Sequence, residues 1–342
     1  MPWLRERIWP VEAKLDADDV YWGARLACAE MTRGGTARFW DMYWHPEATA
    51  RAVADAGLGA TIGAPLFDHE GDGEGMRRRA LASLERLAEL GPAIAPALAP
   101  HSIYTVSESS LRWIAELGAE RELPIQIHLA ETEREVADCV AAHGLRPAAY
   151  LDSVGMLGAR TVLAHGVWLD RAELELVAAR GATVVTNPVA NMKLAVGGVF
   201  PYPAARAAGV AVGLGSDGAG SNDSLDLLAD LKIFALAQKH AAADPTAIAA
   251  AEAWAVATGA QAPLLGAGEP LAVGGAADFL LLDPGAPELG IGDLVSNLVY
   301  AAAGSAVDTA VVGGRVLMRG GQPPEMGEIV ARAAERAERL GL

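Results

Sequence analysis

Short apolar runs that end in a polar side chain recur along this chain, and they limit the folds available to it. Such runs precede His128, His165 and Asp217. They are typical of buried parallel strands, which present polar residues at their C-terminal ends. Amphipathic helical patterns separate the runs from residue 17 to Leu214. Because this alternation is typical of a parallel sheet with crossover helices, we predict an α/β fold of the (β/α)8 TIM-barrel type.

A change in composition after Gly266 predicts a second unit. The chain has 342 residues, enough for a barrel of about 250 residues and a smaller appendage. We assign residues 1–265 to the barrel, with a Gly- and acid-rich surface loop at 68–75. Short strands separated by glycines follow, and we assign residues 266–325 to this second, smaller unit. A polar amphipathic pattern over 326–342 predicts a final helix.

The net charge limits which molecules this protein can bind, and its cysteines indicate the cellular compartment in which it works. The formal net charge is −16 and no basic cluster is present, which argues against nucleic acid as a partner. No uncharged apolar run approaches the roughly 18 residues of a membrane span, and the first residues lack the apolar core of a secretion signal. Cys28 and Cys139 are isolated, as expected for buried thiols in a reducing compartment. We therefore predict a cytoplasmic protein, for which a homo-oligomer remains open.

The polar residues at the strand ends form a candidate metal site. His128, His165 and Asp217 come from three different predicted strands, and Glu131 follows His128 by three residues. Each has an ordinary structural alternative: a hydrogen-bonded core histidine, a surface glutamate, or the N-cap aspartate of a helix. Catalytic residues gather at the C-terminal end of a βα barrel, so their shared placement favours the functional interpretation.

Two motifs make the chain resemble a known family. Pro100-His101-Ser102 through Thr105 is similar to a PHxxYT segment, and residues 215–222 are similar to a G(S/T)DGxxSN segment. Both belong to the amidohydrolase superfamily, within the deaminases of S-adenosylhomocysteine, methylthioadenosine and related adenosines. The resemblance extends from Trp3 to about Gly320, and it implies that residues 266–325 form the C-terminal half of a small β-sandwich beside the barrel. It implies hydrolytic deamination of an adenosine-type nucleoside to the inosine analogue and ammonia.

The resemblance also implies a role for each candidate metal-site residue. His128 and Asp217 would ligate one divalent metal ion, with His165 beside them. That ion would be zinc, with iron and manganese as alternatives, because histidine and aspartate ligands suit all three. Glu131 would shuttle a proton to the purine, Asp217 would take the proton of the attacking water, and His165 would polarise the nucleophile.

Four residues are implied as contacts of a small-molecule nucleoside substrate. Glu12 matches a glutamate that hydrogen-bonds ribose hydroxyls, and Trp3 matches a tryptophan of the substrate pocket. His101 and Ser221 would contact the purine or the ribose.

Substitutions at two positions bear on the choice of substrate. Family members that bind homocysteine carry two arginines, at positions that match Ala64 and Met76 here. Neither residue can bind a carboxylate through two hydrogen bonds. The sequence therefore favours methylthioadenosine, 5′-deoxyadenosine or adenosine over S-adenosylhomocysteine, while Arg77 is expected to open the next helix. Further along the chain, we interpret Asn191 and Lys193 as residues that order a loop.

The His-x-His ligand pair of the family has no counterpart in this sequence. The seven histidines stand at 45, 69, 101, 128, 143, 165 and 240, and no two are separated by a single residue. The family's first barrel strand is missing as well, so we expect the given sequence to be an N-terminally truncated fragment. Such a chain is expected to bind metal weakly and to have little or no deaminase activity, since a catalytic zinc usually has three protein ligands.

Two other functions remain open from the sequence. One is a different amidohydrolase activity, such as a guanine or 8-oxoguanine deaminase or a chlorotriazine hydrolase. Glu12 argues for a nucleoside, because a free base has no ribose. The other is an inactive fragment that keeps the barrel but lacks the His-x-His ligands.

Overall fold

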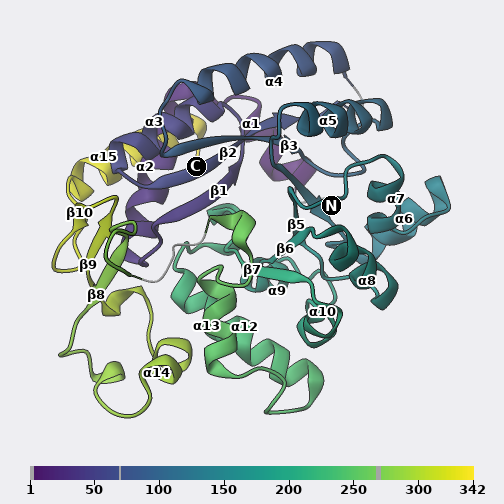
Figure 1. Ribbon diagram of the computed structural model, residues 1–342. Coiled ribbons are helices and arrows are strands. Elements are labelled where there is room, and N and C mark those ends of the chain that lie inside the picture. Colours follow the sequence, from purple (N-terminus) through teal and green to yellow (C-terminus); the bar gives the residue numbers. More distant parts are fainter. Residues whose placement is uncertain (1–3, 69–70, 267–270) are drawn as a thin grey trace.

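A parallel sheet of seven strands forms the main body of the molecule (Figure 1). The computed structural model describes residues 4–68, 71–266 and 271–342. The strands pair in sequential order, and the sheet curls into an open half-barrel. The strands are β1 (Arg38–Met42), β2 (Gly59–Leu66), β3 (Ile94–Pro100), β4 (Ile125–Leu129), β5 (Thr161–His165), β6 (Thr183–Thr186) and β7 (Ala211–Leu214).

The half-barrel stays open between its first and last strands. Within the described residues, no strand pairs with the outer edge of β1 or of β7. An eight-stranded barrel closes through that pairing. The predicted TIM-barrel fold class, with one strand missing, is therefore confirmed.

Helices cover the outside of the sheet and connect successive strands (Figure 1). Ser107, Thr132 and Asp170 each accept a backbone N–H from the first turn of a helix, as N-cap residues do. No helix in the described ranges is long and apolar enough to cross a membrane. This layer comprises α3 (Pro46–Ala56), α4 (Gly73–Ala88), α5 (Glu108–Glu120), α6 (Glu133–His143), α7 (Pro147–Ser153), α8 (Arg171–Arg180), α9 (Pro188–Lys193), α10 (Tyr202–Ala208), α11 (Ala219–Asn222), α12 (Leu227–Ala242), α13 (Ala250–Ala257) and the 3-10 turn Pro263–Leu265.

Helix α4 begins earlier than the sequence indicated. Of the predicted surface loop at 68–75, residues 69–70 lie outside the described residues, and α4 already starts at Gly73. The Asp72 carboxylate accepts the N–H of Gly75 at 2.8 Å. This cap offsets the poor helix propensity of the two glycines in the first turn. Arg77 lies inside the helix rather than at its start.

Successive side chains of each strand face alternately toward the outer helices and toward the interior of the half-barrel. On β4, Ile125, Ile127 and Leu129 are buried against the outer helices. Gln126 and His128 instead line the interior of the half-barrel. Because successive side chains of a strand point to opposite faces, the same strand supplies both the core and the interior.

A small antiparallel sheet lies beside β1 and α2 (Ala17–Arg33) (Figure 1). Its strand order is β10-β9-β8, and β8 begins at Phe279. The limits of the barrel, the sandwich and the final helix stay predictions. The elements of this part are β8 (Phe279–Leu282), the 3-10 turns Pro287–Leu289 and Gly304–Ala306, α14 (Leu294–Tyr300), β9 (Val307–Val312) and β10 (Arg315–Met318).

The C-terminal helix α15 (Met326–Leu340) packs on α2. Arg339 forms an ion pair with the buried carboxylate of Asp19, and Arg336 pairs with Asp18 at 3.4 Å. Arg25 of α2 bonds Glu325, directly before α15, at 2.8 Å. The final helix therefore adds to the helical layer of the barrel.

The N-terminal segment lies near the ends of the strands. A short helical stretch, Leu4–Ile8, leads into α1 (Trp9–Glu12). The ring of Trp9 meets that of Phe67, which follows β2, edge-on at 6.0 Å. This contact places α1 at the end of the half-barrel where the candidate residues gather.

Candidate active site

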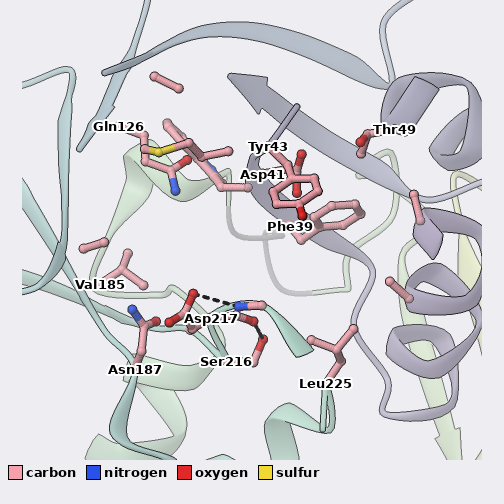
Figure 2. Close-up of a pocket in the computed structure, with 18 of the residues that line it drawn as sticks. Phe39, Asp41, Tyr43, Thr49, Gln126, Val185, Asn187, Ser216, Asp217 and Leu225 are labelled. Carbon is pink, nitrogen blue, oxygen red and sulfur yellow. Dashed lines mark hydrogen bonds between the residues drawn. The ribbon is translucent and has the colours of Figure 1, made fainter. Parts of the chain in front are cut away.

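A cavity of about 1570 Å³ opens inside the half-barrel and collects the candidate residues. Figure 2 shows part of its wall, with Asp217 and Ser216 across the cavity from Phe39 and Tyr43. Trp3 lies outside the described residues. The other seven predicted site residues all line this cavity: Glu12, His101, His128, Glu131, His165, Asp217 and Ser221.

Three imidazole rings stand next to one another in the wall. The ring centroids of His101 and His128 lie 4.8 Å apart, and those of His128 and His165 lie 5.4 Å apart. His101 directly follows β3, His128 is the penultimate residue of β4, and His165 ends β5. Neighbouring strands are about 4.8 Å apart, so the pairing of the sheet sets the spacing of the rings.

Hydrogen bonds fix two of these rings through one nitrogen each. His128 donates from Nδ1 to the carbonyl of His101 at 2.7 Å. His165 donates from Nδ1 to Oδ1 of Asn191 at 2.8 Å. A neutral ring that donates from Nδ1 keeps a lone pair on Nε2. Metal-binding histidines are commonly oriented by such a second partner.

Burial and charge act differently on the three rings. Burial, followed by the charges of His128 and His165, lowers the pKa of His101 well below its usual value. Burial and His165 also lower the pKa of His128. Burial opposes protonation of His165 too, but Glu131 and Asp217 outweigh it and raise the pKa of that ring. His101 and His128 are thus neutral at pH 7, and both carboxylates lie close enough to act on His165.

Left-handed backbone turns occur at the ends of the strands that bear these groups. Ala130, His165 and Asp217 have φ angles of 51°, 76° and 60°. Such angles are costly for residues with a Cβ atom and are concentrated at functional sites. Each turn redirects the chain as it leaves β4, β5 or β7.

A buried polar network supports the loop that carries Asp217. Asn222 donates from Nδ2 to the Ser216 carbonyl and to the Asp230 carboxylate, both at 2.8 Å. Asp217 itself accepts the N–H of Gly218 at 2.7 Å (Figure 2). Asp230 is 2% exposed, and burial raises its pKa to about 7.

The donor set fits a divalent metal ion in kind, but it is incomplete. Imidazole nitrogens and a carboxylate are ligands that zinc accepts. In the ranges that the structure describes, however, no three His, Cys, Asp or Glu side chains form a group able to hold a metal ion. His128, His165 and Asp217 line one cavity, but they are not close enough together to coordinate one ion. Their assignment as ligands stays a prediction.

The substrate side of the cavity contains a predicted carboxylate and unpredicted aromatic rings. Burial is the main reason that the pKa of Tyr43 is raised, and the charge of Glu12 is the second. The two side chains are therefore close neighbours. Phe67 lies 4.8 Å from His101 and 6.1 Å from Trp44, measured between ring centroids. The sequence analysis missed these aromatic residues, because none belongs to a motif with a recognised spacing.

The positions matching the missing arginines differ in their surroundings. Met76 lines the cavity, whereas Ala64 is fully buried in the core between sheet and helices. Only the position of Met76 can therefore face a ligand directly. Arg77 turns away, donating to Ser109 and Ser110 at 3.0 and 3.1 Å. Arg79, one helical turn beyond Met76, lines the cavity instead.

Several supporting residues also escaped sequence reasoning. Asn191 lies in α9 and holds the ring of His165. Lys193, at the end of α9, pairs with Asp223 directly after α11 at 2.6 Å. The sequence segment that begins at Asn187-Pro188 could have indicated that Asn191 supports the site. Nothing local in the sequence pointed to Asp230 or Glu135, since their partners are known only from the fold.

Comparison with known proteins identifies the family. The model of the amidohydrolase family matches residues 1–317. This chain belongs to the amidohydrolase family, whose members bind a divalent metal ion. The predicted family is therefore confirmed.

Relatives with established names are deaminases of nucleosides. A 5′-deoxyadenosine deaminase of Methanoregula boonei is 47% identical, over 99% of this chain and 78% of that protein. The 5-methylthioadenosine/S-adenosylhomocysteine deaminase 1 of Archaeoglobus fulgidus is 41% identical, over 99% of this chain and 81% of its own length. Among solved structures, an adenosine deaminase from Xanthomonas campestris with bound zinc has a TM-score of 0.93 at 33% identity, covering 100% of this chain and 80% of that one.

Proposed function

We propose that this chain is a metal-dependent hydrolase that deaminates an adenosine-type nucleoside, releasing the inosine analogue and ammonia. The observation that carries the proposal is the shared cavity, which joins the imidazoles and carboxylates of the strand ends with Glu12 of α1. The names of the relatives support the same reaction on the same class of substrate.

The proposed cofactor is zinc, the ion held by the Xanthomonas structure. His128, His165 and Asp217 would contribute ligands. A bound divalent ion supplies a nucleophile at neutral pH by lowering the pKa of water from 15.7 to about 7.

The protein's own groups would move protons and stabilise charge. Asp217 would accept a proton from the attacking water, and Glu131 would deliver one to the ring nitrogen of the purine. Although burial opposes it, Glu131 and Asp217 raise the pKa of His165. A more basic ring is a better metal ligand, and from that position His165 would help to polarise the attacking water. The neutral ring of His101 would contact the purine or the ribose.

Glu12 is the proposed ribose ligand. A carboxylate can accept from two adjacent hydroxyl groups at once, and hydrogen bonds to an ionised acceptor are the stronger kind. Ser221 lines the same cavity and would contact the purine.

Substitution of Glu12 tests the proposal. With zinc in excess, turnover of 5′-deoxyadenosine and of guanine should be compared in Glu12→Gln and in the surface control Glu6→Gln. We expect Glu12→Gln to lower kcat/KM for the nucleoside by an amount equivalent to about 1.5–3 kcal/mol, and the control to match the unmodified chain. Unchanged nucleoside turnover in Glu12→Gln, or preferred turnover of guanine, would favour a base deaminase.

A further inference from the structure

The turn between β4 and α6 carries Glu131 and sets the direction in which its side chain leaves the backbone. Glu131 is 8% exposed and lines the cavity. Among the described residues, its carboxylate has no hydrogen-bond partner, whereas its backbone N–H has one. The preceding residue, Ala130, has the left-handed φ of 51°. A turn of this kind must be held by other groups.

Glu135 supplies that support from the first turn of α6. One of its carboxylate oxygens accepts the N–H of Ala130 at 2.8 Å, and the other accepts the N–H of Glu131 at 2.9 Å. Glu135 is 7% exposed. Each oxygen holds one of two successive peptide groups, so the plane of the turn is fixed at two points.

We propose that Glu135 is a positioning residue, which holds the Ala130–Glu131 turn so that the Glu131 carboxylate faces the reacting centre. This inference rests on the proposed function of Glu131 as the proton shuttle. Glu135 itself touches neither substrate nor metal in this scheme.

Ordinary helix capping does not account for these bonds. In a capping box, the glutamate at the third helical position accepts the N–H of the N-cap residue. Helix α8 follows this rule, since Glu173 accepts the N–H of Asp170, its N-cap residue. The N-cap of α6 is Thr132, and its hydroxyl accepts the N–H of Glu135. Glu135 instead accepts the N–H groups of Ala130 and Glu131, which precede Thr132. It therefore stabilises the turn and not the start of the helix.

Burial makes the charged form of the Glu135 carboxylate unfavourable, and the two amides of the turn compensate for part of this cost. Burial raises the pKa of Glu135 to about 7, while the two backbone N–H groups act in the opposite direction. A buried carboxyl without partners is unfavourable, and the paired amides provide the compensation. A glutamine would present an N–H₂ group to one of the two amide donors, so it cannot replace both bonds.

Two measurements on Glu135→Gln test the inference, with Glu173→Gln as the matched control. Both are buried glutamates at the third position of a helix, but Glu173 does not hold the Glu131 turn. Amide hydrogen exchange of the metal-free chain reports opening of the turn directly. We expect exchange at Ala130 or Glu131 to accelerate at least tenfold in Glu135→Gln and to stay unchanged in Glu173→Gln.

Steady-state kinetics with zinc in excess then separate positioning from general stability. We expect Glu135→Gln to lower kcat by about 10- to 100-fold with KM nearly constant, as for a misplaced catalytic group. Glu173→Gln should lower the thermal midpoint without this kcat effect. Unchanged exchange at both amides, or a kcat loss shared equally by the control, would overturn the inference. If the unmodified chain deaminates nothing, the proposed function fails, and the exchange data still decide whether Glu135 holds the turn.

Discussion

His165 illustrates how a single side chain depends on its neighbours in this molecule. It ends β5, adopts a left-handed backbone angle of 76°, and donates its Nδ1 hydrogen to Asn191. The carboxylates of Glu131 and Asp217 act on the same ring. Its chemistry is therefore set by residues from three other segments.

Removal of the Asn191 side chain tests this dependence. In Asn191→Ala the Nδ1 hydrogen of His165 loses its partner and the ring can rotate. We expect zinc affinity or turnover to fall about 10- to 100-fold, the usual effect of removing the second partner of a metal-binding histidine. Calorimetric zinc titration measures the change. Met192→Ala, at the exposed neighbour of Asn191, should behave as the unmodified chain, and an equal loss in both variants would contradict the assignment.

Substrate choice is also decided by single residues. Met76 lines the cavity, and its uncharged side chain cannot bind a carboxylate through two hydrogen bonds. We therefore expect higher kcat/KM for methylthioadenosine or 5′-deoxyadenosine than for S-adenosylhomocysteine. One absent charge-assisted bond is worth about 1.5–3 kcal/mol, or roughly tenfold to a hundredfold. The ratio of kcat/KM values checks this. If S-adenosylhomocysteine is preferred and Arg79→Ala removes the preference, then Arg79 binds the carboxylate instead.

At the scale of elements, α12 supports the loop after β7 through a buried carboxyl. Burial raises the pKa of Asp230 from 3.8 to about 7. Between these values the folded state keeps a proton that the unfolded state has released. The contribution of Asp230 to stability is therefore fully present below pH 3.8 and is lost as the pH rises toward 7.

Asp230→Asn tests this pH dependence. Asparagine keeps an oxygen that accepts from Asn222 but cannot ionise. We expect the unfolding free energy of Asp230→Asn minus that of the unmodified chain to rise by a few kcal/mol as the pH increases from about 4 to 8. Urea denaturation at several pH values measures this difference. Asp244→Asn should show almost no change over this range, since hydrogen bonds from the Thr246 hydroxyl and amide lower the pKa of Asp244 and its titration therefore lies below about pH 4. A constant difference across this pH range would show that Asp230 does not titrate there.

At the scale of the whole molecule, the open half-barrel has a direct consequence for metal binding. A closed barrel brings ligands from all its strand ends to one point. Here β1 and β7 are unpaired on their outer edges within the described residues, and no complete group of metal ligands forms among those residues. The cavity is correspondingly large.

We therefore expect this chain to bind zinc weakly. Turnover should rise with added zinc well beyond a stoichiometric amount and disappear with a modest excess of chelator. Metal analysis after gel filtration, together with activity against zinc concentration, measures this. His128→Ala should weaken binding further. Stoichiometric zinc that survives gel filtration would mean that the three donors suffice after rearrangement.

The sequence by itself determined the alternation of strands and helices, the barrel class, and the placement of His128, His165 and Asp217 at the ends of strands. These follow from local patterns, because an apolar run that ends in His128 or Asp217 needs no knowledge of its neighbours. Tertiary structure alone decided which groups support them. Glu135 reaches back to Ala130, Asp230 meets Asn222, and Ala64 faces the core while Met76 faces the cavity. Although the partners of Glu135 and Asp230 are only five and eight residues away, the backbone turns and packing that bring them together follow from no spacing rule.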